Sequence, residues 1–115
     1  MALFGRVRRR SPRAAMAARG ERRAEIETAR RHLEDFVRTR VGVEAFIEPA
    51  TTFIPPTVLL VASSGEWTRR RVADPALVRG LADGLAVPVY DVQLVGYPAR
   101  MRAWNERAKR GDDAS

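Results

Sequence analysis

Few side chains in this chain can carry chemistry, and their types exclude most metal and nucleophile sites. The 115 residues include no cysteine and a single histidine, His32. Thiol nucleophiles, disulfides, zinc–thiolate centres and sites built from two or three histidines are therefore excluded. The 21 basic residues are 20 arginines and Lys109, and the glycines match neither a dinucleotide-binding nor a P-loop pattern. The sequence thus predicts no catalytic residue, no metal site and no cofactor.

Two phenols and a carboxyl group near the end of the chain are the best candidates for proton transfer. Tyr90 and Asp91 are neighbours in an apolar segment, and Tyr97 follows six residues after Asp91. A partly buried carboxyl group beside a phenol can exchange a proton, so these three residues define one alternative, a small oxidoreductase-like enzyme. The competing interpretation is a structural aspartate that accepts hydrogen bonds.

Glu44 and Glu48 share one face of an expected strand and are four residues apart. At about 3.3 Å per residue, their Cα atoms would be about 13 Å apart. This separation is too large for the carboxyl pair of a glycosidase. We therefore expect these carboxylates to form ion pairs with Arg69 or Arg71 on a neighbouring strand.

The formal net charge of +7 is concentrated at the start of the chain. Residues 1–20 contain no acid, whereas the segment 41–98 has four arginines against six acids. Because guanidinium groups pair with phosphates and release counterions, we predict that this segment binds nucleic acid, the ribosome or another polyanion. A solvated tail is the competing interpretation. The arginines of the segment are Arg6, Arg8, Arg9, Arg10, Arg13 and Arg19, of which the first five are its predicted binding residues.

A second predicted binding patch lies on the strand that follows residues 63–66. Trp67, Arg69 and Arg71 alternate along this strand and so share one side of it. An indole and guanidinium forks can stack on bases and pair with phosphates. The competing interpretation is an edge strand that its charges protect from aggregation, with Trp67 packed inward.

Apolar periodicity predicts an α+β fold with one mainly antiparallel sheet. Ser11 and Pro12 are typical of a helix start, and Gly20 is expected to end this first helical stretch. The following elements have the order α-β-β-β-α-β-α, with about four strands and with helices packed over one face of the sheet. They are expected at 21–41 (helix), 43–48, 57–62 and 67–72 (strands), 75–87 (helix), 88–97 (strand) and 98–110 (helix).

The chain is thereby divided into a basic N-terminal arm over 1–20, partly disordered or helical, a single domain over 21–110 and a frayed tail over 111–115. No apolar run is long enough to cross a bilayer core of about 30 Å, and no secretory signal is present, so a cytoplasmic protein is expected. The favoured function is a non-enzymatic domain that its arm tethers to a polyanion. A further alternative is a protein–protein interaction module that docks a partner on the hairpin edge or the last helix.

Three strings, VEAFIEPATT, GEWTRRRV and VPVYDVQLVGYPARM, resemble a small family of uncharacterised actinobacterial proteins with an arginine-rich N-terminus. The resemblance covers Val43 to Trp104, which is most of the expected domain. Some members carry the label oxidoreductase, which is in line with the enzyme alternative. None of the three strings is a catalytic motif, so the resemblance implies no cofactor site and no functional residue.

Overall fold

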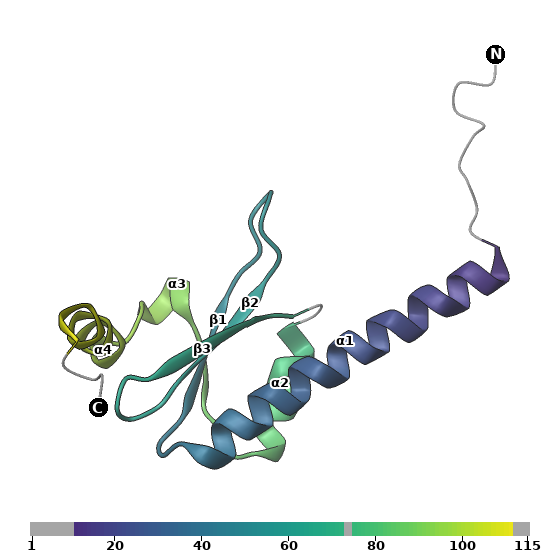
Figure 1. Ribbon diagram of the computed structural model, residues 1–115. Coiled ribbons are helices and arrows are strands. Elements are labelled where there is room, and N and C mark those ends of the chain that lie inside the picture. Colours follow the sequence, from purple (N-terminus) through teal and green to yellow (C-terminus); the bar gives the residue numbers. More distant parts are fainter. Residues whose placement is uncertain (1–10, 73–74, 112–115) are drawn as a thin grey trace.

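The computed structural model describes residues 11–72 and 75–111, and its element order confirms the predicted α+β fold (Figure 1). One short helix, α3, adds to the expected elements. The elements are α1 (Pro12–Thr39), β1 (Glu44–Glu48), β2 (Thr57–Val61), β3 (Trp67–Arg71), α2 (Pro75–Gly84), β4 (Val89–Asp91), α3 (Val92–Val95) and α4 (Ala99–Arg110).

The four strands form one sheet in the order β3-β2-β1-β4. β1, β2 and β3 are an antiparallel meander, as predicted, whereas β4 pairs in parallel with β1. The sheet is therefore mixed. The parallel pair arises because α2 carries the chain from the β3 edge back across the sheet, so that β4 runs in the same direction as β1.

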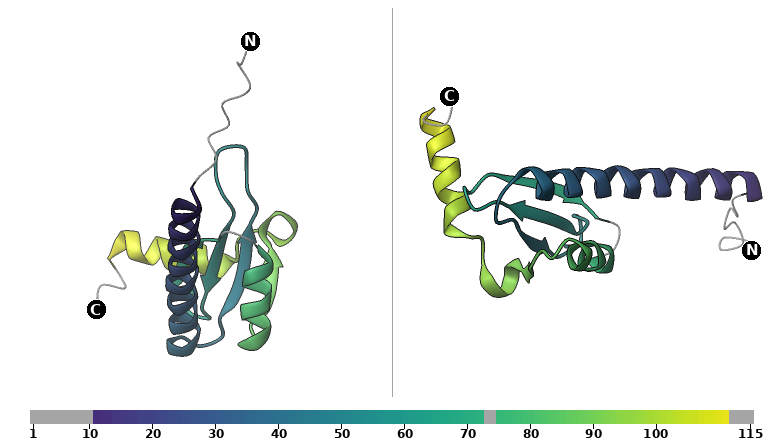
Figure 2. Two further views of the ribbon diagram at one scale, coloured as in Figure 1. Left: turned by 90° about the vertical axis from the view of Figure 1, so that its right-hand side faces the viewer. Right: turned by 90° about the horizontal axis from the view of Figure 1, so that it is seen from below.

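The larger core lies on the face of the sheet that α1 and α2 cover (Figure 2). Because side chains alternate along a strand, every second residue of β1 and β2 points to these helices. The residues of this core are Leu33, Phe36, Val43, Ala45, Ile47, Val58, Leu60, Ala62, Val78, Ala82 and Val87.

A smaller core lies on the opposite face, where Met101 of α4 packs against Phe46, Leu59 and Val61, with Trp67 beside them. The expectation that helices cover one face only is therefore wrong. β1 and β2 have a second apolar face, which must also be covered. As predicted, β2 is the strand that is buried on both sides, since Val58, Leu59 and Val61 have 0% exposure.

α1 runs without interruption through Gly20, so the predicted break there is wrong. The helix begins at the predicted cap, because the Ser11 hydroxyl accepts a hydrogen bond from the Ala14 amide at 3.1 Å. A glycine inside a helix costs only about 1 kcal/mol, and the surrounding alanines and arginines are strong helix formers. The first half of α1 projects beyond the sheet (Figures 1 and 2).

The strand expected over 88–97 is also shorter than predicted. It ends at Asp91, whose carboxylate accepts a hydrogen bond from the Gln93 amide at 2.8 Å and so begins α3. A side chain that bonds to the backbone in this way competes with the strand ladder. Gly96, with a φ of 75°, then ends α3 and leads to α4, which begins where the sequence predicted.

Candidate functional site

A cluster of polar side chains surrounds Glu48 on the face of the sheet that α4 shares. The Glu48 carboxylate accepts hydrogen bonds from Arg69 Nε at 2.6 Å, from Thr57 Oγ1 at 2.6 Å and from the Tyr97 hydroxyl. The predicted ion pair of Glu48 with Arg69 is therefore confirmed, but the two residues are not on neighbouring strands, because β2 lies between β1 and β3. Since Arg69 already has this partner, it contributes little positive charge to a binding surface.

The hydrogen bonds of this cluster determine how its groups ionise. Burial opposes the charged form of Glu48, but bonds from Arg69, Thr57 and Tyr97 outweigh it and lower the pKa of the carboxyl group below its ordinary value. The bond to Glu48, followed by burial, raises the pKa of the Tyr97 phenol. Tyr97 is therefore held in its protonated form as a hydrogen-bond donor, which does not suit a general base.

The three residues of the enzyme alternative do not converge on one point. Tyr90 stacks on Phe46 with 5.4 Å between the ring centroids, on the same face of the sheet as Tyr97. A hydrogen bond to Glu44 is the main cause that raises the pKa of Tyr90. Asp91 instead caps α3. The arrangement thus matches the competing interpretation of Asp91 as a structural hydrogen-bond acceptor.

The predicted patch on β3 is partly used inside the protein. Trp67 donates its indole N–H to the side-chain oxygen of Asn105 on α4 at 2.8 Å, and it packs against the smaller core. The guanidinium of Arg69 lies 5.2 Å from the centre of the Trp67 ring. Of the two arginines in the patch, Arg71 forms no ion pair with any residue the structure describes.

The first turn of α4 is also tied to the sheet, through Arg100. Arg100 donates from Nη2 to Glu44 Oε1 at 2.6 Å and from Nε to the Ala62 carbonyl at 2.9 Å. Glu44 is therefore also paired, but with Arg100 of the last helix rather than with the predicted Arg69 or Arg71 of β3. The sequence offered no local signal for this pair, because the two residues are 56 positions apart.

His32 connects α1 to β3, a role that sequence reasoning missed. Its Nδ1 lies 3.0 Å from Arg70 Nη2 and its Nε2 lies 2.7 Å from Thr68 Oγ1. Because an arginine can only donate, Nδ1 must accept, and the ring proton is then on Nε2 and is donated to Thr68. Burial and the charge of Arg70 lower the pKa of the imidazole, so the neutral ring is the stable form.

The arginines in the first half of α1 differ in their ion pairing from Arg30, which lies nearer the sheet. Arg30 is held by Glu27 and Glu34, each at 2.6 Å. By contrast, four exposed arginines that precede it form no ion pair with any residue in the described part of the chain, and the first turn holds no acid. These four are Arg13, Arg19, Arg22 and Arg23. The other predicted arm residues, Arg6, Arg8, Arg9 and Arg10, lie outside the described residues.

Comparison of the chain with models of protein families, with curated proteins and with solved structures found no match. The resemblance carried by the three strings, and the actinobacterial origin that it implies, therefore stay predictions. Within residues 11–72 and 75–111, no group of three or more acidic or histidine side chains is placed to hold a metal ion. In the same part of the chain, no helix has the length and apolar character that a membrane span requires.

Proposed function

We propose that the protein is a non-enzymatic binding domain whose body presents a basic helical arm to a polyanion, with nucleic acid as the class that suits it best. The observation that carries this proposal is the projection of the first half of α1 beyond the sheet, with Arg13, Arg19, Arg22 and Arg23 free of acidic partners among the described residues. Their charge is directed to solvent rather than neutralised within the domain.

The shape and charge of this arm suit a repeating anion. At about 1.5 Å per residue, the helix between residues 12 and 25 is about 20 Å long, which is the length of several phosphate spacings. The amino end of a helix is its positive end, and no acid in the first turn opposes this field. Glu21 and Glu25 are the only acids in this half of α1. Planar guanidinium forks then bind phosphate oxygens in pairs.

Internal use of the other candidates supports a binding role over an enzymatic one. Tyr97 and Arg69 are bound to Glu48, and Asp91 is a helix cap. Each of these groups has a structural task that accounts for its position. The free arginines of α1 have no such task.

The test is the salt dependence of binding to a fluorescent duplex DNA of about 20 base pairs and to a single-stranded RNA, measured by anisotropy. If the arm neutralises about six phosphates, the slope of log K against log salt should be near −5 on duplex DNA. A triple variant, Arg13→Glu, Arg19→Glu and Arg23→Glu, should make the slope less steep by about 2 to 3 and should weaken binding to every sequence about equally.

A matched variant with the same change in net charge separates position from total charge. Arg31→Glu, Arg79→Glu and Arg102→Glu reverses three exposed arginines elsewhere on the domain. We expect this variant to keep most of the wild-type slope. Equal effects of the two triple variants, or binding that salt does not weaken, would contradict the proposal.

A further inference from the structure

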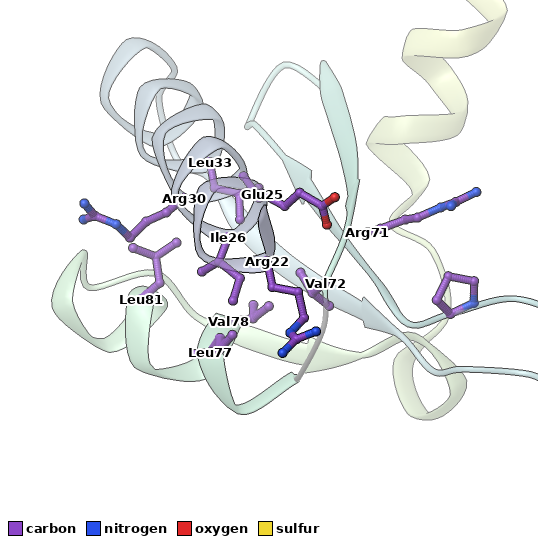
Figure 3. Close-up of a pocket in the computed structure, with 12 residues that line it drawn as sticks. Arg22, Glu25, Ile26, Arg30, Leu33, Arg71, Val72, Leu77, Val78 and Leu81 are labelled. Atoms are coloured by element: carbon purple, nitrogen blue, oxygen red, sulfur yellow. The ribbon is translucent and has the colours of Figure 1, made fainter. Parts of the chain in front are cut away.

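A pocket of about 340 Å³ lies between α1 and α2, at the base of the projecting half of α1 (Figure 3). Its volume falls within the range of about 300–1,000 Å³ that is typical of small-molecule sites. The walls are formed mainly by apolar side chains of the two helices. These side chains are Ile26, Ala29, Leu33, Leu77, Val78 and Leu81.

Part of the apolar surface that lines the pocket is exposed to solvent. Leu33 and Val78 are 4% exposed and belong to the larger core, whereas Ile26 is 38% exposed and Leu77 is 47% exposed. Ala29, which lies between Ile26 and Leu33 along the same stripe of α1, is too small to fill the space. An apolar ligand would remove the exposed surfaces of Ile26 and Leu77 from water, and this burial favours binding.

The charged residues at the rim of the pocket indicate that the ligand carries a negative charge. Arg22 lines the pocket and forms no ion pair with a described residue, and Figure 3 shows its side chain extending toward Leu77 of α2. Arg30 is already paired with two glutamates, and the figure shows Arg30 and Arg71 extending away from the pocket. Glu25 is the one acid in the lining. Arg22 is therefore the cation available to a bound anion.

We infer that this pocket binds a small carboxylate with an apolar body, whose tail lies between α1 and α2 and whose carboxylate contacts Arg22. A water molecule occupies about 30 Å³ in the liquid, and a methylene group has a similar volume. The pocket therefore has room for roughly ten heavy atoms. Octanoate has this size. An apolar wall with one placed cation is the usual composition of a site for such a ligand. This site shares Arg22 with the proposed polyanion surface, but its apolar walls lie outside that surface, which is tested through Arg13, Arg19 and Arg23.

The test compares octanoate with 1-octanol and octyltrimethylammonium, which share the tail but not the negative charge. Binding to the full chain is measured by titration calorimetry and by amide chemical shifts in NMR spectra. We expect octanoate to bind roughly three- to tenfold more tightly than octanol, as one partly exposed ion pair allows, and the cation to bind most weakly. The largest shifts should fall on Ile26, Ala29, Leu77 and Leu81.

Two variants at adjacent positions assign the carboxylate contact. Arg22→Gln should remove the preference for octanoate over octanol and leave the octanol affinity unchanged. Arg23→Gln, which does not line the pocket, should behave as the wild type. The inference is overturned if octanoate binds no better than octanol, if the shifts map to another surface, or if Arg22→Gln retains the preference.

Discussion

Gly65 is the position at which a single added methyl group should disturb the attachment of α4 most. Gly65 is buried in the turn between β2 and β3 and has a φ of +95°, a conformation that residues other than glycine rarely adopt. A Cβ atom built on Gly65 would lie 2.1 Å from the carbonyl oxygen of Arg100 and 2.9 Å from Cβ of Trp104. Both contacts are to atoms that cannot rotate away. Gly65→Ala therefore requires α4 to move.

The cost has two parts that the structure defines. The positive φ disfavours alanine by about 1–2 kcal/mol. Opening the contact to Arg100 requires a shift of about 1 Å, and an overpacked site of this kind typically costs about 1–3 kcal/mol. We expect Gly65→Ala to lower the free energy of unfolding by about 2–5 kcal/mol, a large part of the roughly 5–15 kcal/mol that stabilises a small domain.

Urea unfolding followed by tryptophan fluorescence measures this loss directly. Trp67 and Trp104 are the two tryptophans of the chain, and both lie where α4 meets the sheet, so their emission also reports whether α4 is docked. Gly80→Ala is the matched control. Gly80 lies inside α2 with no heavy atom within 4 Å of its added Cβ, so this variant should be stabilised by about 1 kcal/mol.

The changes in the free energy of unfolding expected for Gly65→Ala and Gly80→Ala have opposite signs, so the two variants can be told apart directly. Neutral surface substitutions change the free energy of unfolding by up to about 0.5 kcal/mol. If the free energy of unfolding of Gly65→Ala differs from that of the wild type by no more than this, α4 does not pack on this turn as described. An unchanged tryptophan emission spectrum in that variant would lead to the same conclusion.

Two further predictions concern the ionisable groups that join distant segments. The pKa of His32 in the folded state lies below its ordinary value of 6.5. As the pH falls, the unfolded chain therefore takes up this proton before the folded protein does. The stability that neutral His32 provides is present above about pH 6.5 and is lost as the pH falls further. Urea unfolding between pH 7.5 and 5.5 should show this loss in the wild type but not in His32→Gln, and a similar loss in the variant would refute the assignment. Glu48 also has a lowered pKa, so its contribution is present above its ordinary value of 4.5 and is lost on further acidification. At pH 7, Glu48→Gln should destabilise the domain by about 1–3 kcal/mol, because Arg69 loses its partner, whereas wild-type stability in the variant would show that the cluster contributes nothing.

The elements that sequence reasoning located correctly are those whose signal is local. The alternation of Val43, Ala45 and Ile47 with Glu44, Phe46 and Glu48 indicated β1, and the apolar run TVLLVA indicated the central strand. The spacing of Met101 and Trp104 indicated α4 and its buried side. The ion pair of Glu48 with Arg69 was also predicted, but on the premise of adjacent strands, whereas β2 lies between β1 and β3.

The errors arose where a local signal was weak or a distant partner decided the outcome. Gly20 was expected to end a helix, but the helix-forming residues on both sides carry α1 through it. The cap at Asp91 had a signal in the sequence, since Gly96 follows closely enough to end a single helical turn. The apolar alternation of 88–97 predicted one strand without regard to that cap, whereas residues 92–95 form α3.

Taken alone, the sequence determined the chemistry that the chain can offer, because residue types are independent of the fold: no thiol, one imidazole, one lysine and an excess of arginine at the start. It also determined most helices and strands, because their periodicity is a property of neighbouring residues. Only the tertiary structure decided which arginines have acidic partners and which remain free, that His32 joins α1 to β3, and that a pocket opens between α1 and α2. The physical reason is that ion pairs, ring contacts and cavities depend on distances between segments tens of residues apart, which only the packing of helices on the sheet establishes.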